Sequence, residues 1–177
     1  IHLSAADLKA LYRGAFLHDI GMLSIPDGIL HKGGRLEPEE YEVIKSHPVI
    51  GDTLCANLRV LHPVRPIVRH HHERLDGSGY PDGLSGEEIP LSARIIGVAD
   101  AFDAMSCDRP YRRALDRQVI SNEFQRFSGT QFDPNLAKEM LLLLETGVWD
   151  VDPQLLADLL GQLCELGGEL IDTGHAV

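Results

Sequence analysis

The sequence predicts an all-α fold from three observations. Apolar residues recur at helical spacing along most of the chain. Prolines and capping residues stand where these segments begin, and glycine-rich stretches separate them. The chain has 177 residues, which is enough for one domain with a sizeable core.

Composition and charge restrict the possible partners. The sequence has 16 Lys and Arg residues against 27 Asp and Glu residues, a net charge of −11 with neutral histidines. Such a surface repels long nucleic acids, although a small anionic ligand is compatible with it if metal ions or a few arginines offset the field. No apolar run reaches membrane-spanning length and no signal peptide is visible, so we expect a cytoplasmic protein without a membrane segment.

The cysteines indicate a reducing compartment. They have no C-x-x-C spacing, which argues against a disulfide scaffold or a zinc ribbon. The three are Cys55, Cys107 and Cys164.

The first helix is predicted over residues 5–21. Ser4 can cap it, with Asp7 as the capping-box partner, and apolar residues follow at helical spacing. His18 and Asp19 fall in its last turn. The simpler interpretation is a core helix with a hydrogen-bonded histidine.

Two further helices are predicted after a connecting loop over residues 21–35. Pro38 suits the first position of a helix that runs to about residue 46. His47 precedes Pro48 and therefore avoids the α region, so a new helix is expected over residues 48–58. A histidine at such a junction is more often structural than metal-binding.

A helix over residues 64–73 carries three consecutive histidines, His70, His71 and His72. Because neighbouring residues on a helix differ by about 100°, His71 and His72 can share one ion only from the end of the helix, and His70 is expected to point elsewhere. A glycine-rich loop without regular structure is expected over residues 75–90. The alternative is a surface histidine run beside an ordinary turn.

The segment over residues 91–105 is a strongly apolar helix that contains Asp100 and Asp103. A carboxylate in such a helix needs a partner, either a metal ion or an arginine. A dense basic patch follows over residues 108–113. The alternative interpretation of this patch is a solvated turn whose arginines pair with nearby acids. Helices are then predicted over residues 119–127, 135–146 and 153–171, and the last could pack on the core or on a second copy, as in a homodimer.

Six side chains form the candidate metal centre. Each lies at a helix end or in an apolar helix, and mixed imidazole and carboxylate ligands suit Mn, Fe, Co or Zn. Six ligands are more than one tetrahedral ion can bind. They suit two ions bridged by a carboxylate, with Asp19 as the natural bridge. Two ions about 3.5–4 Å apart can activate a water for phosphoryl displacement. The six are His18, Asp19, His47, His71, His72 and Asp100.

The sequence resembles the HD-GYP family of metal-dependent phosphohydrolases over roughly residues 11–144. The resemblance rests on several motifs in the same order as in the family. They are His18-Asp19-Ile20-Gly21, Ile25-Pro26-Asp27, His47-Pro48 with Gly51, His71-His72-Glu73-Arg74 with Asp76-Gly77-Ser78-Gly79-Tyr80-Pro81, Gly86-Glu87 with Ile89-Pro90, Val98-Ala99-Asp100 with Phe102-Asp103-Ala104, Asp108-Arg109-Pro110-Tyr111-Arg112, and Phe132-Asp133-Pro134.

The resemblance implies an HD-type helical bundle with an ordered Gly-Tyr-Pro loop and two or three divalent ions, iron or manganese. It implies that Asp19 is the catalytic carboxylate and bridges two ions. His18 and Asp100 would complete the shell of one ion. The second ion would be held by the remaining histidines, His47, His71 and His72.

The resemblance also implies the reaction, which is hydrolysis of cyclic di-GMP to pGpG and often on to GMP. Tyr80 and Pro81 would line the substrate site, and Asp103, Arg109 and Arg112 would contact the substrate. Residues 1–150 would form the HD-GYP domain and residues 151–177 a C-terminal helix and tail, with a regulatory sensory domain expected outside this chain.

Two departures from the family pattern keep alternatives open. The family has a further histidine on a helix that would lie before Ile1, and we expect that helix to have been lost from the chain. The family also has a lysine where this sequence has Met22, and methionine cannot donate to an oxyanion. The alternatives are a degenerate module that binds cyclic di-GMP or a protein partner without turnover, and a phosphohydrolase for another cyclic dinucleotide or nucleotide.

Overall fold

The computed structural model describes residues 3–108 and 112–147, and the chain divides into two compact units, Ile1–Leu141 and Leu142–Val177. Within the described residues there are helices and two isolated β-bridges but no strand, which confirms the predicted all-α class. The helix predicted over residues 153–171 and the boundary predicted at residue 150 lie outside the described residues.

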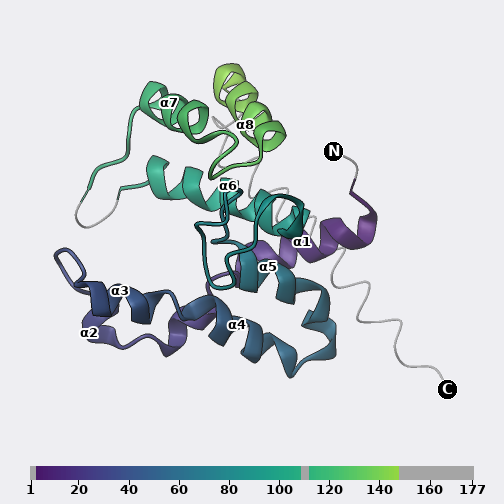
Figure 1. Ribbon diagram of the computed structural model, residues 1–177, viewed down its shortest axis with the longest axis vertical. Helices are drawn as coiled ribbons and strands as arrows, with labels where there is room; N and C mark the ends of the chain where they lie inside the picture. Colours follow the sequence, from purple (N-terminus) through teal and green to yellow (C-terminus); the bar gives the residue numbers. More distant parts are fainter. Residues whose placement is uncertain (1–2, 109–111, 148–177) are drawn as a thin grey trace, which may run out of the picture. The chain divides into compact units, whose positions relative to one another are not determined.

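The described residues form α-helices with a few 3-10 turns (η) between them (Figure 1), and a long loop separates α5 from η3. The elements are α1 (Ala5–Leu17), η1 (Ile20–Ser24), α2 (Asp27–Leu30), α3 (Pro38–Ile44), α4 (His47–Ala56), η2 (Arg59–Val64), α5 (Arg65–His70), η3 (Gly86–Glu88), α6 (Leu91–Ser106), α7 (Arg117–Phe127) and α8 (Pro134–Thr146).

The N-terminal ends of α1 and α3 form as their sequences predict. Ser4 and Asp7 make a reciprocal capping box, in which the Ser4 hydroxyl accepts from the Asp7 amide at 3.1 Å. Pro38 stands in the first turn of α3, and a second capping box joins Glu37 to Glu40.

The helix predicted over residues 5–21 is shorter than expected, because α1 ends at Leu17 and the chain tightens into η1. A Cβ atom on Gly21 would lie only 2.0 Å from the carbonyl oxygen of His47 and 2.8 Å from the amide nitrogen of Gly51. The backbone of η1 therefore packs directly on the first turns of α4. The loop expected over residues 21–35 contains both η1 and α2.

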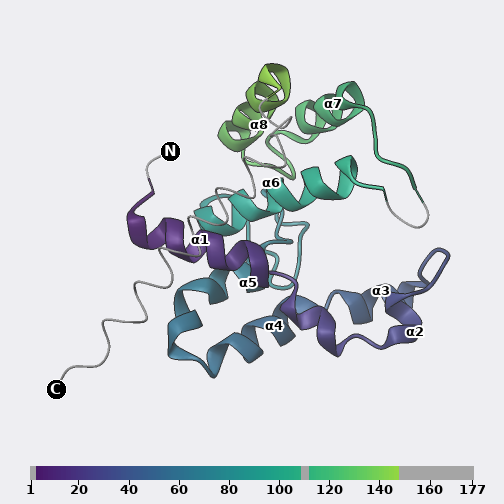
Figure 2. The same ribbon diagram turned by 180° about the vertical axis from the view of Figure 1, so that it is seen from behind.

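Helix α5 is the buried centre of this unit. It packs against α1, α4 and α6, and Figure 1 and Figure 2 show it between α4 and α6. Ile67 and Val68 are fully buried, and Gly14 of α1 approaches Ile67 so closely that an added Cβ would lie 2.6 Å from its Cδ1. The helix predicted over residues 64–73 is shorter than expected: Val64 is the last residue of η2, and α5 covers Arg65–His70 and ends before His71.

The core next to α5 joins α4 and η2 to the end of α1. Cys55, Val64 and Val68 form a buried cluster. Partly buried apolar side chains pack against it, namely Leu17, Ile20 and Leu61. None of the helices in the described ranges is both long enough and apolar enough to cross a membrane.

Candidate metal centre

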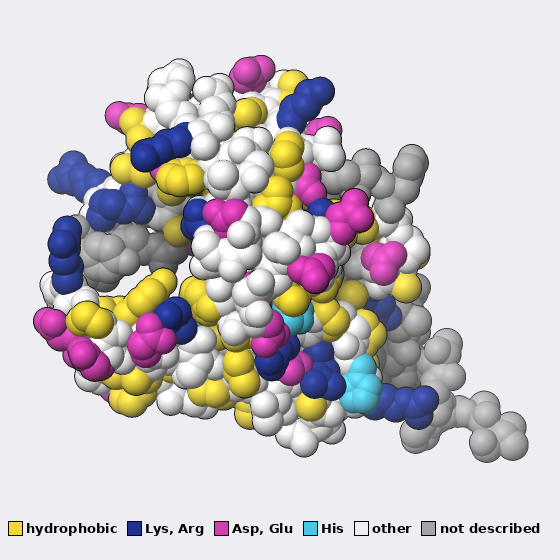
Figure 3. All heavy atoms as spheres, in the orientation of Figure 1, with side chains coloured by type: hydrophobic (Ala, Val, Ile, Leu, Met, Phe, Trp, Pro, Cys, Tyr) yellow, Lys and Arg dark blue, Asp and Glu magenta, His cyan; other side chains and the backbone are white. Residues whose placement is uncertain are grey.

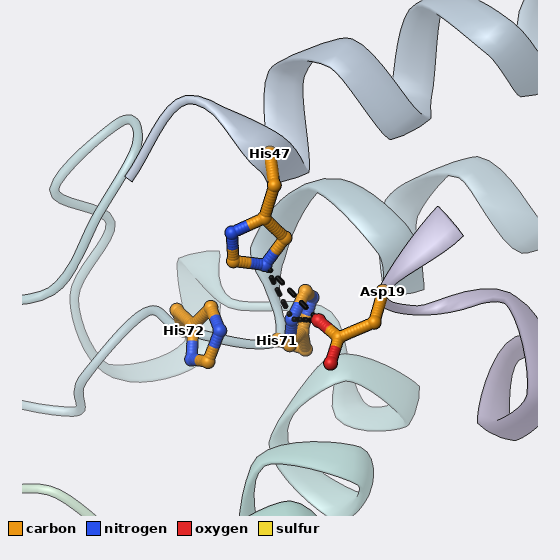
Figure 4. Close-up of side chains that lie close together, drawn as sticks. All are labelled: Asp19, His47, His71 and His72. Carbon is orange, nitrogen blue, oxygen red and sulfur yellow. Dashed lines mark hydrogen bonds and ion pairs between the residues drawn. The ribbon is translucent and has the colours of Figure 1, made fainter. Parts of the chain in front are cut away.

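Four side chains from separate elements meet at the ends of α1, α4 and α5. Asp19 follows α1, His47 opens α4, and His71 and His72 follow α5. One potential ligand atom of each lies within 4.8 Å of those of the other three (Figure 4). These four side chains could hold a metal ion, because imidazole nitrogens and carboxylate oxygens are its usual ligands.

The two oxygens of Asp19 face different partners. Oδ1 lies 3.2 Å from Nε2 of His47 and 3.6 Å from Nε2 of His71. Oδ2 lies 3.5 Å from Nε2 of His18, which is itself 3.9 Å from Oδ1 of Asp100. Asp19 therefore stands between two groups of potential ligands, and a carboxylate in that position could bridge two ions.

Three of the imidazole rings are oriented by the backbone in the same way. Nδ1 of His18 lies 2.8 Å from the carbonyl oxygen of Ala15, and the corresponding distances from His47 to Ile44 and from His71 to Val68 are 2.7 Å and 2.9 Å. Each carbonyl oxygen accepts a hydrogen bond from the Nδ1–H group. Donation from Nδ1 leaves Nε2 unprotonated, which is the form that binds a metal.

His72 is positioned by the loop that follows it. Its ring stacks on Tyr80, with ring centroids 4.8 Å apart and an interplanar angle of 29°. Burial, followed by the neighbouring His71 and His47 rings, lowers the pKa of His72 to about 3. The ring is therefore neutral at pH 7 and its lone pair is available.

The carboxylates respond differently to the same surroundings. Burial raises the pKa of Asp19, but hydrogen bonds from His47 and His71 and the charge of His18 outweigh it, so the pKa of Asp19 lies well below its usual range. Burial raises the pKa of Asp100, and the charge of His18 opposes that rise. Asp19 is thus the anionic centre of the group.

The loop after the histidines is held by Glu73, whose side chain is fully buried. Its carboxylate accepts hydrogen bonds from the backbone amides of Asp82 at 2.7 Å and Leu84 at 3.1 Å. Gly79 lies so close to the start of the loop that an added Cβ would be 2.3 Å from the Arg74 amide nitrogen. The Tyr80–Pro81 peptide bond is cis, and the loop presents Tyr80 to His72.

A cavity of about 520 Å³ lies between this loop and α6. His72, Tyr80 and Asp100 line the part nearest the candidate metal centre. Arg94 and Asp133 line it as well and form an ion pair at 2.6 Å. His72, Asp100 and Tyr80 of the Gly-Tyr-Pro loop therefore face the same cavity.

The remaining candidate residues lie outside the four-residue group. Asp103 is exposed on α6 and accepts a hydrogen bond from Sγ of Cys107 at 3.4 Å. Arg112 donates from Nη2 to the carbonyl oxygen of Ala104, and Arg109 lies outside the described residues. His70 points away from the group, with Nδ1 at 3.5 Å from Oδ2 of Asp82.

Sequence reasoning gave no role to Glu73 or to the pair of Arg69 and Asp82. Arg69 donates two hydrogen bonds to Asp82, from Nε at 2.7 Å and from Nη2 at 2.8 Å. These two hydrogen bonds join α5 to the residue that follows the Gly-Tyr-Pro motif. The signal that could have identified Glu73 is an acid directly after the three histidines and before a glycine-rich loop whose backbone amides need acceptors.

Comparison with known proteins identifies a matching family and several relatives. A model of the HD domain family matches residues 2–136. The chain is 43% identical over 141 residues to the cyclic di-GMP phosphodiesterase response regulator RpfG of Xanthomonas campestris, and 44% identical over 137 residues to a cyclic di-GMP phosphodiesterase of Thermotoga maritima. These matches cover 78% and 76% of this chain but 37% of each relative.

A relative with a different printed substrate is nearly as similar. The chain is 36% identical over 150 residues to the 3'3'-cGAMP-specific phosphodiesterase 2 of Vibrio cholerae, a match that covers 84% of this chain and 28% of the relative. The crystal structure of a cyclic GMP-AMP phosphodiesterase of the same organism, V-cGAP3, matches with a TM-score of 0.60 at 24% identity, covering 88% of this chain and 41% of that one. The chain shares the fold of V-cGAP3. It spans less than two fifths of the length of the three curated relatives named above.

Proposed function

The chain belongs to the HD domain family and is homologous to HD-GYP cyclic di-GMP phosphodiesterases. From this premise we propose that it is a metal-dependent phosphodiesterase that hydrolyses cyclic di-GMP to pGpG, to GMP or to both. One observation carries the proposal beyond family membership. The two oxygens of Asp19 face two groups of ligands, at 3.2 Å from His47 and 3.5 Å from His18.

The residues present fit a pair of divalent ions. His18, Asp19 and Asp100 would hold one ion. Asp19 would bind the second ion together with His47, His71 and His72. The Nδ1 atoms of His47 and His71 bind backbone carbonyls, which leaves Nε2 facing Asp19, and burial lowers the pKa of His72 to about 3. Mixed nitrogen and oxygen ligands favour iron or manganese over ions that prefer thiolates.

The chemistry of such a centre suits a phosphodiester. Bound divalent ions would supply an activated water and offset the negative charge that develops on the phosphate oxygens. Asp19 holds the ligand set together and keeps its negative charge at neutral pH. Tyr80 and Pro81 would border the bound nucleotide, and Asp103, Arg109 and Arg112 would contact its polar groups.

Two alternatives have a specific observation behind them. Hydrolysis of 3'3'-cGAMP is the second candidate, because a relative at 36% identity acts on that compound according to its name. Binding without turnover is the third, because Met22 stands three residues after Asp19 where a donor to the phosphate would be useful.

Turnover by the metal-loaded chain tests the proposal. The chain is loaded anaerobically with Fe(II) or Mn(II) and incubated with cyclic di-GMP or 3'3'-cGAMP, and the products are separated by chromatography. We expect pGpG or GMP, a rate that falls by at least about a hundredfold in Asp19→Asn, and no change in Glu39→Gln, which alters an exposed acid of α3. Bound metal and bound nucleotide without product would instead support the binding module.

A further inference from the structure

A second group of potential metal ligands lies beside the Gly-Tyr-Pro loop. One ligand atom from each of His70, Glu73 and Asp82 lies within 4.8 Å of the other two. We call these three side chains the loop cluster. His70 is the last residue of α5, Glu73 directly follows the three histidines, and Asp82 follows the Gly-Tyr-Pro motif. The loop cluster therefore joins the end of the helix to both ends of the loop.

The loop cluster is distinct from the candidate metal centre. None of its members belongs to the group formed by Asp19 and the other histidines. Consecutive residues at a helix end point in directions about 100° apart, so His70 and His71 serve different sites. Figure 3 shows acidic, basic and histidine side chains gathered over α4 and α5 on this face of the molecule.

The distances within the loop cluster suit one ion. Nδ1 of His70 lies 3.5 Å from Oδ2 of Asp82 and 3.8 Å from Oε1 of Glu73. Two atoms that bind a tetrahedral zinc ion, each about 2.1 Å from it, are about 3.4 Å apart. The separations in the structure are close to that value, so a small rotation of the His70 ring brings all three atoms within reach of one ion.

Two members of the loop cluster lack the partner that burial requires. The Glu73 side chain is fully buried, and no Lys or Arg pairs with its carboxylate within residues 3–108 and 112–147. Nδ1 of His70 is buried and makes no hydrogen bond in the described part of the chain. Buried charges in proteins are paired or bind a metal ion, and a buried polar atom without a partner is rare. One ion would serve both side chains.

Neighbouring groups already orient the two carboxylates. Oε1 and Oε2 of Glu73 accept hydrogen bonds from the amides of Asp82 and Leu84, and Oδ2 of Asp82 accepts one from Nε of Arg69 at 2.7 Å. A carboxylate oxygen has two lone pairs, so Oε1 and Oδ2 can each bind an ion as well. Hydrogen bonds of this kind position the ligands of metal sites. Arg69 offsets the charge of Asp82 and leaves that of Glu73 for the ion.

We propose that the loop cluster binds one divalent transition-metal ion, with His70, Glu73 and Asp82 as its three protein ligands and water in the open positions. One imidazole and two carboxylates suit zinc or manganese, and the general order of affinities favours zinc over manganese. The ion would fasten α5 to the residue after the Gly-Tyr-Pro motif and would stiffen the loop that presents Tyr80 to His72. It is additional to the ions of the candidate metal centre.

Zinc binding to the full chain tests the assignment. The chain is dialysed against buffered free Zn(II), and the zinc bound per chain is measured by mass spectrometry. We expect His70→Asn and Asp82→Asn each to lose one of the zinc ions that the parent chain binds, with the Kd of that ion raised by at least about tenfold. The matched control is His62→Asn, which removes an exposed histidine of η2 and should leave zinc binding unchanged.

Hydrogen exchange of the amides over residues 79–85 reports where the ion binds. Zinc at about a hundred times its Kd should slow any exchange that requires release of the ion by up to about a hundredfold. This protection should persist in Asp19→Asn, which alters the candidate metal centre, and should disappear in His70→Asn.

Three results would overturn the proposal. The first is equal zinc binding by His70→Asn and His62→Asn, or by Asp82→Asn and His62→Asn if His70→Asn fails to fold. The second is loop exchange in the parent chain that zinc does not slow, because an ion held by both Glu73 and Asp82 must restrain the segment between them. The third is loss of the protection in Asp19→Asn, since the ion would then belong to the candidate metal centre.

Discussion

The buried carboxylate of Glu73 accepts a hydrogen bond from the backbone amide of Asp82 at 2.7 Å, across the whole Gly-Tyr-Pro loop. A second bond, from the Leu84 amide at 3.1 Å, uses the other oxygen. The loop is thereby attached to the residue that directly follows His72, so the position of Tyr80 depends on the Glu73 side chain.

Replacing Glu73 with glutamine should loosen this loop. One carboxylate oxygen becomes an amide nitrogen that faces a backbone donor, and an unsatisfied buried donor costs about 1–3 kcal/mol. We expect faster hydrogen exchange of the amides over residues 79–85, measured by mass spectrometry, and a lower stability in urea. Glu87→Gln, at an exposed position of the same loop, is the control, and equal exchange in the two variants would contradict the role of Glu73.

Gly21→Ala should destabilise the chain and disturb the candidate metal centre. The added methyl group would meet the carbonyl oxygen of His47 at 2.0 Å, and overpacking of this kind typically costs about 1–3 kcal/mol. Gly28→Ala is the matched control, because a Cβ at Gly28 meets nothing within 4 Å. Urea unfolding of both variants gives the measurement, and similar midpoints would show that η1 can move away from α4.

Met22→Lys should accelerate turnover of a cyclic dinucleotide. The Met22 amide donates to the carbonyl oxygen of Asp19 at 2.9 Å, and the Met22 side chain lines a pocket together with Arg112, so a lysine there can donate to a phosphate oxygen. Loss of one such donor costs about 10²–10³ in rate in other enzymes, and we expect kcat to rise by at least about tenfold. Leu23→Lys adds the same charge at a neighbouring side chain that is 80% exposed, and an equal gain there would indicate general charge attraction.

Arg94 and Asp133 should be energetically coupled. Their ion pair at 2.6 Å joins α6 to the residue before α8, and both side chains are mostly buried, at 18% and 12% exposed. Removing one partner leaves a poorly solvated charge and should cost about 1–3 kcal/mol. Unfolding in urea of Arg94→Leu, Asp133→Leu and the double variant forms a thermodynamic cycle. Strictly additive losses would show that the pair contributes no coupling.

Addition of Mn(II) should raise the unfolding temperature of the chain, and a chelator should reverse the gain. An ion at about a hundred times its Kd stabilises the folded state by about 2.7 kcal/mol. The metal-dependent rise in unfolding temperature should be smaller in Asp19→Asn than in His18→Asn. Asp19 offers one oxygen to each group of ligands, whereas His18 belongs to one group. Equal unfolding temperatures with and without metal would contradict binding at this centre.

The local elements follow from sequence wherever a local interaction decides them. The capping box of Ser4 and the first turn at Pro38 involve residues three apart or fewer, so a reader of the sequence can predict them. Boundaries that depend on distant segments were predicted less well. α1 ends at Leu17 because Gly21 contacts the backbone of α4, and α5 ends at His70 because the chain then enters the loop anchored by Glu73.

The sequence by itself determined the all-α class and supplied the histidines and acids of the candidate centre, since helical periodicity and ligand chemistry are properties of residue type and spacing. Only the tertiary structure decided that Asp19 stands between two groups of ligands, that Nδ1 of three rings binds a backbone carbonyl, and that Glu73 holds the loop. These relationships join residues as far apart in the sequence as His18 and Asp100 or depend on ring orientation. The packing of α1, α4 and α6 around the buried helix α5 fixes them, and no local pattern encodes that packing.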